Sequence, residues 1–387
     1  MSDDLLRYRS EFPILERTTY LISNSLGAMP RGVYDSLHSY ADIWATRGVR
    51  AWEERWWMLA AEVGDQIGTL MNAPRSSVAI LPNVTTCQAV VASCFDFSGK
   101  RNKVVYSDLN FPSVMYFWEA QRERGARVEM AKTDGICVPT DRLLALIDEN
   151  TLVVPVSHVI FRSAYINDAR AIVERAHQVG AYVVLDTFQS LGTVPVDVQA
   201  LGVDFACGGV LKWLCGGPGV AYLYVRPDLA PKLQPKFTGW LAHQEPFAFR
   251  IGPIQYTDPP YRFINGTPNV PAMEAALPGL KIIQEVGVSL IREKSKRQTA
   301  RLIALAEQRG WRVNTPRDPE RRGGTVSIDM PDSQQVCAEL LKRDVLVDWR
   351  PNAGVRMSPH FYNTDQELET AIATVDEILL SRAALAR

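Results

Sequence analysis

Residues 183–219, VVLDTFQSLGTVPVDVQALGVDFACGGVLKWLCGGPG, contain the pattern that decides the fold of this chain. The apolar run at 182–185 is typical of a buried parallel strand, and it ends in a carboxylate, Asp186. A second short strand, predicted at 203–206, leads to Lys212. The glycines around this lysine indicate a tight backbone that leaves room for a bulky group: Gly208, Gly209, Gly216, Gly217 and Gly219.

Asp186 and Lys212 are the residue types that a pyridoxal phosphate site requires. A lysine amine condenses with an aldehyde to give a Schiff base, and a carboxylate keeps the pyridine nitrogen of the cofactor protonated. The segment that joins the two residues is long enough for one connection and a second strand. Both residues can therefore lie at the same edge of one sheet. Taken singly, a helix-capping Asp and a solvated Lys would explain them. The pair, together with Gln189 and the glycines, favours the cofactor.

The same stretch resembles the core of the class V aminotransferase group of fold-type-I pyridoxal phosphate enzymes, and within that group it is most similar to kynureninase. Further matches follow in the order of the family: YLISNSLGAMP (20–30), NVTTCQ (83–88), FPS (111–113), GWLAH (239–243) and GVRMSPHFYNT (354–364). The resemblance implies pyridoxal 5′-phosphate as cofactor and an α-amino acid as substrate. It also implies an α/β fold, with a doubly wound, mainly parallel sheet in a large domain and a smaller α/β C-terminal domain.

Several residues receive cofactor-binding roles. Thr85 and Thr86 follow a predicted strand and open a helix, where N–H groups and hydroxyls can hold a phosphate at the positive end of the helix dipole. Plain helix capping would also explain them, and the resemblance favours the phosphate. It further implies that Phe111 stacks on the cofactor ring, that Ser157 contacts the cofactor and that Gln189 hydrogen-bonds near its phenolate oxygen.

Substrate and partner contacts are implied in the same way. Arg356 matches the family arginine that takes the substrate α-carboxylate, a planar anion that suits a guanidinium. Asn24 and Ser25 lie in the N-terminal arm, which the family places at the mouth of the site, and are expected to contact the substrate. Trp240 and Thr267 match positions that the family supplies from the neighbouring subunit, which predicts a homodimer with shared active sites.

The chain also departs from the kynureninase pattern. The family has Ser-Tyr just before the lysine, whereas here Val210 and Leu211 precede Lys212 and Gly209 falls where that Ser would be. Val114 replaces an Asp after FPS. The His and Asn that read the hydroxyl-aryl end of 3-hydroxykynurenine are missing, from the early loop at 47–50 and from the neighbour's loop at 266–269. These differences predict a substrate other than 3-hydroxykynurenine.

Arg162 falls where the family has a Tyr that helps to hold the cofactor phosphate. A phosphate dianion short of donors is costly to bury, so we expect the guanidinium to compensate for the lost Tyr before Lys212. Two alternatives stay open. Arg162 could read a second acidic group on the substrate, or it could reach out of the pocket to an acidic neighbour.

Length and composition narrow the function class. A chain of 387 residues suits an N-terminal arm (1–30), a large cofactor-binding domain (31–270) and a small C-terminal domain (271–387). The net charge of −1 gives no sign of nucleic acid or anionic membrane as a partner. The sequence lacks a signal core and a membrane-length apolar run, so we expect a cytoplasmic protein. Six cysteines and five histidines lack ligand spacing, so no metal site is expected.

The apolar pattern places the elements. Residues 31–72 read as helices, and strands and helices alternate from 78 to 226, with a helix predicted at about 168–179. One long helix is predicted at about 272–309. A β-α-β-α pattern follows, with strands at 325–328 and 345–348 and a helix at about 333–343.

We expect the enzyme to cleave a Cβ–Cγ bond of an amino acid hydrolytically, with Lys212 as the general acid–base. An aminotransferase, lyase or epimerase on the same fold is the alternative. A cysteine desulfurase is disfavoured because the loop at 351–363 lacks a nucleophilic Cys. A pyridoxal-binding regulator without catalysis would not need Arg356, and a dinucleotide-binding protein would need the GxGxxG that the chain lacks.

Overall fold

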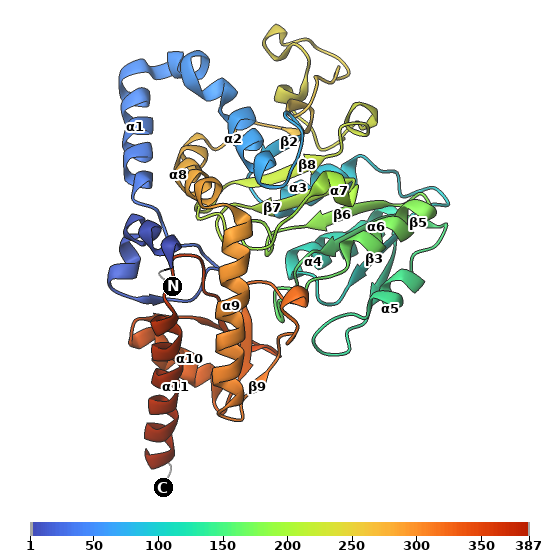
Figure 1. Cartoon of the computed structure of the whole chain (residues 1–387). Helices are drawn as coiled ribbons and strands as arrows, with labels where there is room; N and C mark the ends of the chain where they lie inside the picture. Colours follow the sequence, from blue (N-terminus) through green and yellow to red (C-terminus); the bar gives the residue numbers. More distant parts are fainter. Residues whose placement is uncertain (1–2, 386–387) are drawn as a thin grey trace.

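The computed structural model describes residues 3–385 and is built around a mixed sheet of seven strands in the order β2-β8-β7-β6-β5-β3-β4 (Figure 1). The strands β3 to β7 run parallel, whereas β8 is antiparallel to both of its neighbours. The mainly parallel α/β architecture confirms the predicted fold class. The strand bounds are β2 (Val78–Leu81), β3 (Lys103–Ser107), β4 (Arg127–Ala131), β5 (Thr151–Ser157), β6 (Tyr182–Asp186), β7 (Phe205–Gly209) and β8 (Ala221–Val225).

Helices pack on this sheet because their apolar faces need a buried partner. The contacts place α2 on β2 and β8, α3 on β7 and β8, and α6 on β5 and β6. Before α2, the region predicted as helical contains α1, a 3-10 turn and a π-helical segment at Trp52–Trp56. The helix bounds are α1 (Gly32–Arg47), α2 (Trp57–Leu70), α3 (Val84–Ser93), α4 (Pro112–Ala120), α5 (Thr140–Ala145), α6 (Ala169–Gln178), α7 (Val198–Leu201) and α8 (Val270–Val286).

The strand predicted at 203–206 is shifted in the structure. It begins at Phe205 and continues to Gly209, because β7 takes its register from both β6 and β8. The glycines at 208 and 209 therefore belong to a buried strand. Apolar alternation alone would have ended the strand before them, since glycine is depleted in strands.

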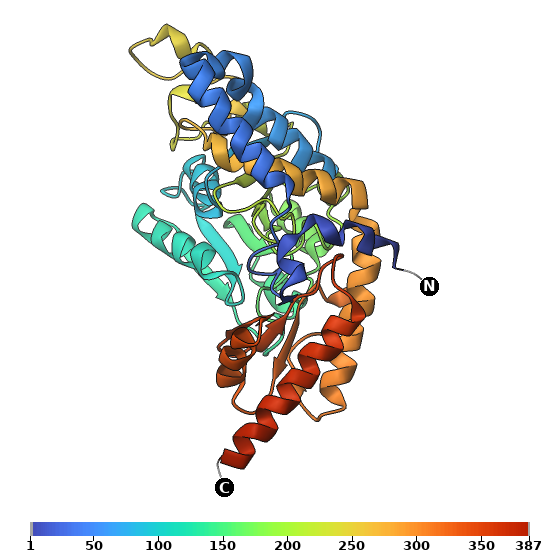
Figure 2. The same cartoon turned by 90° about the vertical axis from the view of Figure 1, so that its left-hand side faces the viewer.

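The C-terminal part carries a second, antiparallel sheet of four strands in the order β12-β13-β10-β9. Helices α9 and α11 run side by side in both views (Figures 1 and 2). The β-α-β-α prediction missed β9 and β13. The bounds are α9 (Val288–Glu307), β9 (Arg312–Val313), β10 (Val326–Asp329), α10 (Ser333–Lys342), β12 (Asp348–Arg350), β13 (Gly354–Met357) and α11 (Asp365–Leu385).

Two predicted elements are each divided in two. The long helix expected at 272–309 is interrupted at Gly287, whose φ of 83° is available to glycine at little cost, so that α8 and α9 are separate helices. The strand expected at 345–348 is split between two sheets. β11 (Val345–Leu346) pairs in parallel with β1 (Thr19–Tyr20) of the N-terminal arm, whereas β12 pairs with β13.

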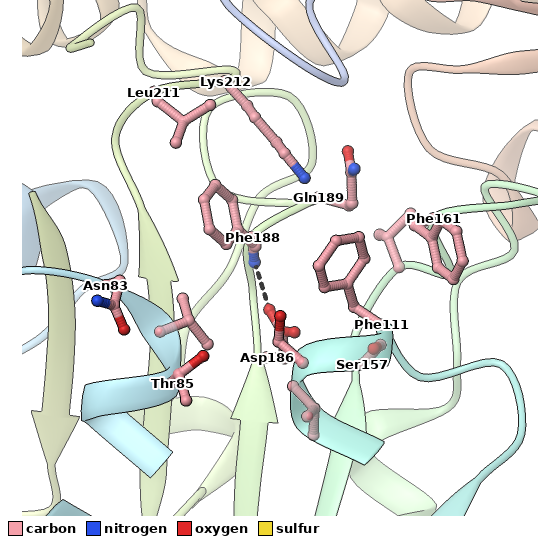
Figure 3. A pocket seen from close by; sticks show the side chains of 14 residues that line it. Asn83, Thr85, Phe111, Ser157, Phe161, Asp186, Phe188, Gln189, Leu211 and Lys212 are labelled. Atoms are coloured by element: carbon pink, nitrogen blue, oxygen red, sulfur yellow. Dashed lines mark hydrogen bonds between the residues drawn. The ribbon is translucent and has the colours of Figure 1, made fainter. Parts of the chain in front are cut away.

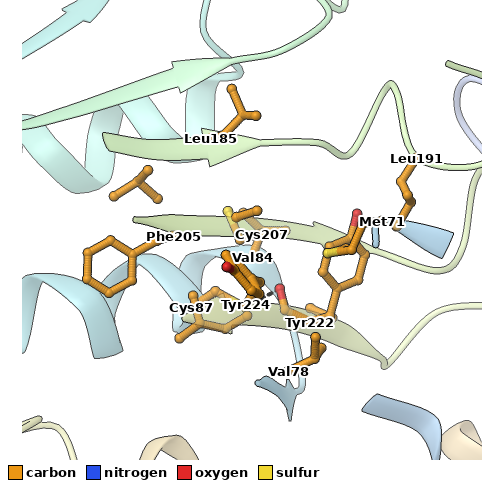
Figure 4. Packing of buried hydrophobic residues seen from close by; sticks show 14 of the residues in the cluster. Met71, Val78, Val84, Cys87, Leu185, Leu191, Phe205, Cys207, Tyr222 and Tyr224 are labelled. Atoms are coloured by element: carbon orange, nitrogen blue, oxygen red, sulfur yellow. Dashed lines mark hydrogen bonds between the residues drawn. The ribbon is translucent and has the colours of Figure 1, made fainter. Parts of the chain in front are cut away.

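Buried apolar residues form two large clusters. The first holds the seven-stranded sheet, and Figure 4 shows side chains of β6, β7, β8 and α3 within it, among them Leu185, Phe205, Tyr222 and Cys87. The second begins with Leu21 of the arm and continues with residues 302–378. The predicted domain boundaries stay predictions, and α8 packs into the first cluster although it follows the boundary placed at 270.

The part of the chain described, residues 3–385, contains no helix with the length and apolar character needed to cross a bilayer.

Helix α8 approaches the segment after Lys212 through Gly279. A Cβ atom at this position would lie 2.5 Å from the carbonyl oxygens of both Leu214 and Cys215. We expect Gly279→Ala to destabilise the protein by about 1–3 kcal/mol through overpacking, although alanine normally favours a helix. Thermal unfolding followed by circular dichroism measures the effect.

Gly99→Ala is the matched control, because nothing lies within 4 Å of a Cβ at Gly99. An equal melting temperature for Gly279→Ala and wild type would show that α8 does not depend on this close approach.

Candidate active site

The candidate site lies at the carboxyl edge of the large sheet. Ser157 ends β5, Asp186 ends β6 and the two are register partners, while Lys212 comes shortly after β7. This is the edge at which open α/β sheets bind their ligands. A cavity of about 260 Å³ opens there, and six residues predicted from the sequence line it: Thr85, Phe111, Ser157, Asp186, Gln189 and Lys212 (Figure 3).

Asp186 is a buried carboxylate at the floor of this cavity. Its Oδ1 atom accepts a hydrogen bond of 2.9 Å from the backbone N–H of Phe188. Burial raises the pKa of Asp186, and the N–H of Phe188 and the charge of Lys212 only partly oppose this rise. The charge of Lys212 thus offsets the burial of this carboxylate only in part, and a protonated pyridine nitrogen would supply a further cation.

Lys212 extends into the cavity from above, as Figure 3 shows. Desolvation lowers the pKa of its amine to about 8, against the opposing attraction of Asp186. Near neutral pH an appreciable fraction of the amine is thus unprotonated and nucleophilic. Pyridoxal phosphate needs a carboxylate beside its pyridine nitrogen and a lysine that can react with its aldehyde. The cavity has a buried carboxylate below and a lysine above, so the residues present fit the cofactor.

The start of helix α3 forms another wall. Asn83 caps the helix by accepting from the backbone N–H of Thr86 at 2.9 Å, and the hydroxyl of Thr86 lies 3.1 Å from the same oxygen. Thr85 lines the cavity, and Thr86 does not. Asn83, which also lines the cavity, escaped the sequence analysis, although Asn followed by Thr-Thr after a strand is a recognisable N-cap signal.

The amide of Gln189 is fixed from both sides. Its Nε2 donates to the backbone oxygen of Asn24 at 3.0 Å, and its Oε1 accepts from the indole N–H of Trp213 at 3.0 Å. One N–H of the amide has no partner among these contacts, and the side chain lines the cavity. Its predicted contact near the cofactor phenolate stays a prediction.

Arg356 is buried beside the cavity rather than among the residues that line it. Its Nε and Nη2 donate to the two carboxylate oxygens of Asp348 at 2.7 and 2.6 Å, and its Nη1 donates to the carbonyl of Phe161 at 2.6 Å. In the amide orientation that pairs donors with acceptors, Asn24 Oδ1 accepts from Arg356 Nη2 at 3.0 Å and Asn24 Nδ2 donates to Ser358.

Asp348 is a residue that the sequence analysis missed. It faces Arg356 across the ladder between β12 and β13, where the two are register partners. The signal would have been a strand-turn-strand pattern around the Pro-Asn-Ala-Gly turn at 351–354.

Arg162 lies outside the cavity lining in the part of the chain described. Its guanidinium carbon is 5.5 Å from the ring centroid of Phe161, which does line the cavity, and its carbonyl accepts a hydrogen bond from Ser327. The three roles considered for Arg162 stay predictions.

Ser25, Trp240 and Thr267 are also absent from the cavity wall of the described chain. Trp240 packs in an aromatic group with Trp57 and Phe247, at centroid distances of 5.9 and 5.7 Å. Thr267 lines a separate pocket of about 170 Å³. This placement leaves the predicted contribution of Trp240 and Thr267 to a neighbouring subunit as a prediction.

Comparison with known proteins identifies the family. The family described as aminotransferase class-V matches residues 19–370. An uncharacterized aminotransferase, YcbU, of Bacillus subtilis is 32% identical, with 96% of each chain covered. A kynureninase of Bacillus thuringiensis subsp. konkukian is 27% identical, covering 97% of this chain and 92% of the relative. The fold is shared with a cysteine desulfurase of Thermococcus onnurineus, at 21% identity, a TM-score of 0.87 and coverage of 97% and 98%.

The match of the family along most of the chain agrees with the buried carboxylate and the nucleophilic lysine at the sheet edge. The chain therefore belongs to the class V aminotransferase family of enzymes, and its cofactor is pyridoxal 5′-phosphate.

Proposed function

We propose that this enzyme cleaves a Cβ–Cγ bond of an α-amino acid hydrolytically, as kynureninases do, and that its substrate is not 3-hydroxykynurenine. The observation that carries the proposal is the similarity to kynureninases along 97% of the chain. The walls of the cavity suit an apolar acyl group, since Val114, Val159 and Phe161 line it. Hydration of a γ-carbonyl and loss of the acyl group would release an acid and alanine.

The chain's own residues divide the work. When bound, pyridoxal phosphate supplies an electron sink for the charge that develops at the substrate Cα. Asp186, at the cavity floor, would keep the pyridine nitrogen protonated. Lys212, whose pKa is about 8, would hold the cofactor through its amine and would act as the general acid and base for protons at Cα and at C4′.

Arg356 is the proposed contact for the substrate α-carboxylate. A guanidinium has five N–H donors. The N–H groups of Nε and Nη2 donate to Asp348, and Asn24 also accepts from these two nitrogens. One N–H of Nη1 donates to the carbonyl of Phe161. The remaining N–H of Nη1 is the donor left for a substrate oxygen. Asn24 would thus act by holding Arg356 in place.

An aminotransferase is the second candidate, because the relative YcbU is named one at 32% identity. A lyase or an epimerase would use the same cofactor and the same two catalytic residues. A cysteine desulfurase is disfavoured. None of the six cysteines lies among the residues that line the described cavity, and Cys337 is buried in the second apolar cluster.

We also propose a homodimer in which Trp240 and Thr267 complete the partner's site. In support, Trp240 lies within a segment of exposed apolar side chains that a partner would cover: Phe237, Trp240, Phe247, Phe249 and Ile251. Monomeric proteins seldom expose such groups together.

A panel of amino acids tests the reaction. We expect alanine to appear from at least one γ-carbonyl amino acid, with poor activity on kynurenine and no preference for 3-hydroxykynurenine, because the directed donors for its hydroxyl are missing. Alanine release and keto-acid formation are measured side by side. Efficient, selective turnover of 3-hydroxykynurenine contradicts the substrate proposal, and amino-group transfer without alanine release assigns the enzyme to the aminotransferases.

The pH dependence of cofactor capture tests the role of Lys212. Only the neutral amine reacts, so the capture rate of the apoenzyme should rise with pH around a midpoint near 8. Asp186→Asn should move this midpoint lower, because the carboxylate charge stabilises the ammonium form. Stopped-flow absorbance near the cofactor band measures both, and Lys212→Ala is the control that captures nothing covalently. A midpoint near 10 would contradict a desolvated amine.

Hybrid dimers test the shared site. One protomer carries Lys212→Ala, and the other carries Trp240→Ala with Thr267→Ala. Each parent dimer should be nearly inactive, whereas random mixing should restore about a quarter of wild-type activity, since half of the dimers are hybrids with one intact site each. Co-expression with two affinity tags provides the hybrids. Hybrids no more active than their parents would show that these residues serve their own chain.

A further inference from the structure

Two phenylalanine rings stand on opposite sides of the space below Lys212, as Figure 3 shows. The lysine Nζ is 4.3 Å from the ring centroid of Phe188 and 5.6 Å from that of Phe111. The carboxylate of Asp186 lies below the gap between the rings. The result is a slot with two aromatic walls, an acid at its floor and the amine at its mouth.

Each ring is held by its own local structure. Phe111 is the N-cap residue of α4, and its ring meets that of Phe161 edge to face at 5.3 Å and 81°. Phe188 follows the end of β6, and its backbone N–H is the group that bonds Asp186. The main chain of Phe188 therefore fixes the acid while its side chain forms the wall.

Gly209 makes room for the Phe188 ring. A Cβ atom at Gly209 would lie 2.5, 2.9 and 3.1 Å from the Cζ, Cε2 and Cε1 atoms of that ring. Gly209 lies in β7 without a positive φ, so its backbone would accept any side chain. All three of the nearest atoms belong to the ring of Phe188. A side chain at position 209 would therefore collide with this ring, and glycine avoids the collision.

We propose that Phe188 forms the second face of the site for the cofactor pyridine ring, opposite Phe111, and that Gly209 is the residue that permits it. A positively charged pyridinium between two phenyl faces gains stacking and cation–π attraction. That attraction favours the protonated ring, and it acts with Asp186 at the floor. The inference rests on the cofactor, which family membership establishes, and it holds whichever reaction the enzyme catalyses.

Cofactor affinity of the apoenzyme tests the proposal without reference to turnover. Phe188→Leu keeps the bulk and removes the aromatic face, and Phe111→Leu is the matched change on the other wall. We expect each to raise the pyridoxal phosphate dissociation constant about tenfold and to weaken the induced circular dichroism of the bound cofactor. An unchanged dissociation constant in Phe188→Leu overturns the proposal, whatever Phe111→Leu does.

A double-mutant cycle tests the match between the two positions and guards against misfolding of a single variant. Gly209→Ala in the wild-type background should raise the dissociation constant, because it pushes the Phe188 ring into the slot. In the Phe188→Ala background the same change should have no effect, since the space is then free. An equal effect of Gly209→Ala in both backgrounds shows that the glycine serves something other than the ring and overturns its part of the proposal.

Discussion

The site depends on two opposite charges that share one desolvated cavity without an ion-pair contact. Burial raises the pKa of Asp186 and lowers that of Lys212, so each group is pushed toward its neutral form, and their mutual attraction opposes both shifts. The strand ends enforce this arrangement, since β6 and β7 are parallel neighbours whose carboxyl ends meet. A cationic ring placed between the two groups would relieve the acid, and the lysine would be left free to react.

Asn24 connects three parts of the chain that are distant in sequence. Its backbone oxygen accepts from Gln189, which follows β6 of the large sheet, and its side chain joins Arg356 of β13 to Ser358 directly after that strand. The residue is fully buried in the N-terminal arm, and Leu21 of that arm belongs to the second apolar cluster. A displacement of the arm would therefore disturb both Gln189, the proposed cofactor contact, and Arg356, the proposed substrate contact.

The sequence predicted Asp186 and Lys212 from local signals, an acid after an apolar run and a lysine among glycines, and both residues line the cavity. The doubly wound sheet was equally readable from alternating patterns. Asp348 stayed hidden because its role comes from strand pairing, and the apolar pattern at 345–348 concealed a change of sheet. Phe188 stayed hidden because an aromatic residue after a strand usually means core. Gly209 was predicted only as one of several glycines that leave room for a bulky group, and the structure shows that the Phe188 ring fills the space beside it.

The charges around Arg356 would suit the anionic substrate group proposed for it. Asp348 bonds Arg356 bidentately and also lies 3.1 Å from Arg350, so one carboxylate faces two guanidinium groups. Among Arg356, Arg350 and Asp348, one positive charge is in excess. An α-carboxylate would neutralise that excess, and its entry would cost less than burial of an anion in a balanced pocket. Asp348 thus has two effects: it fixes the plane of Arg356, and it limits the surplus to the single charge that one carboxylate can neutralise.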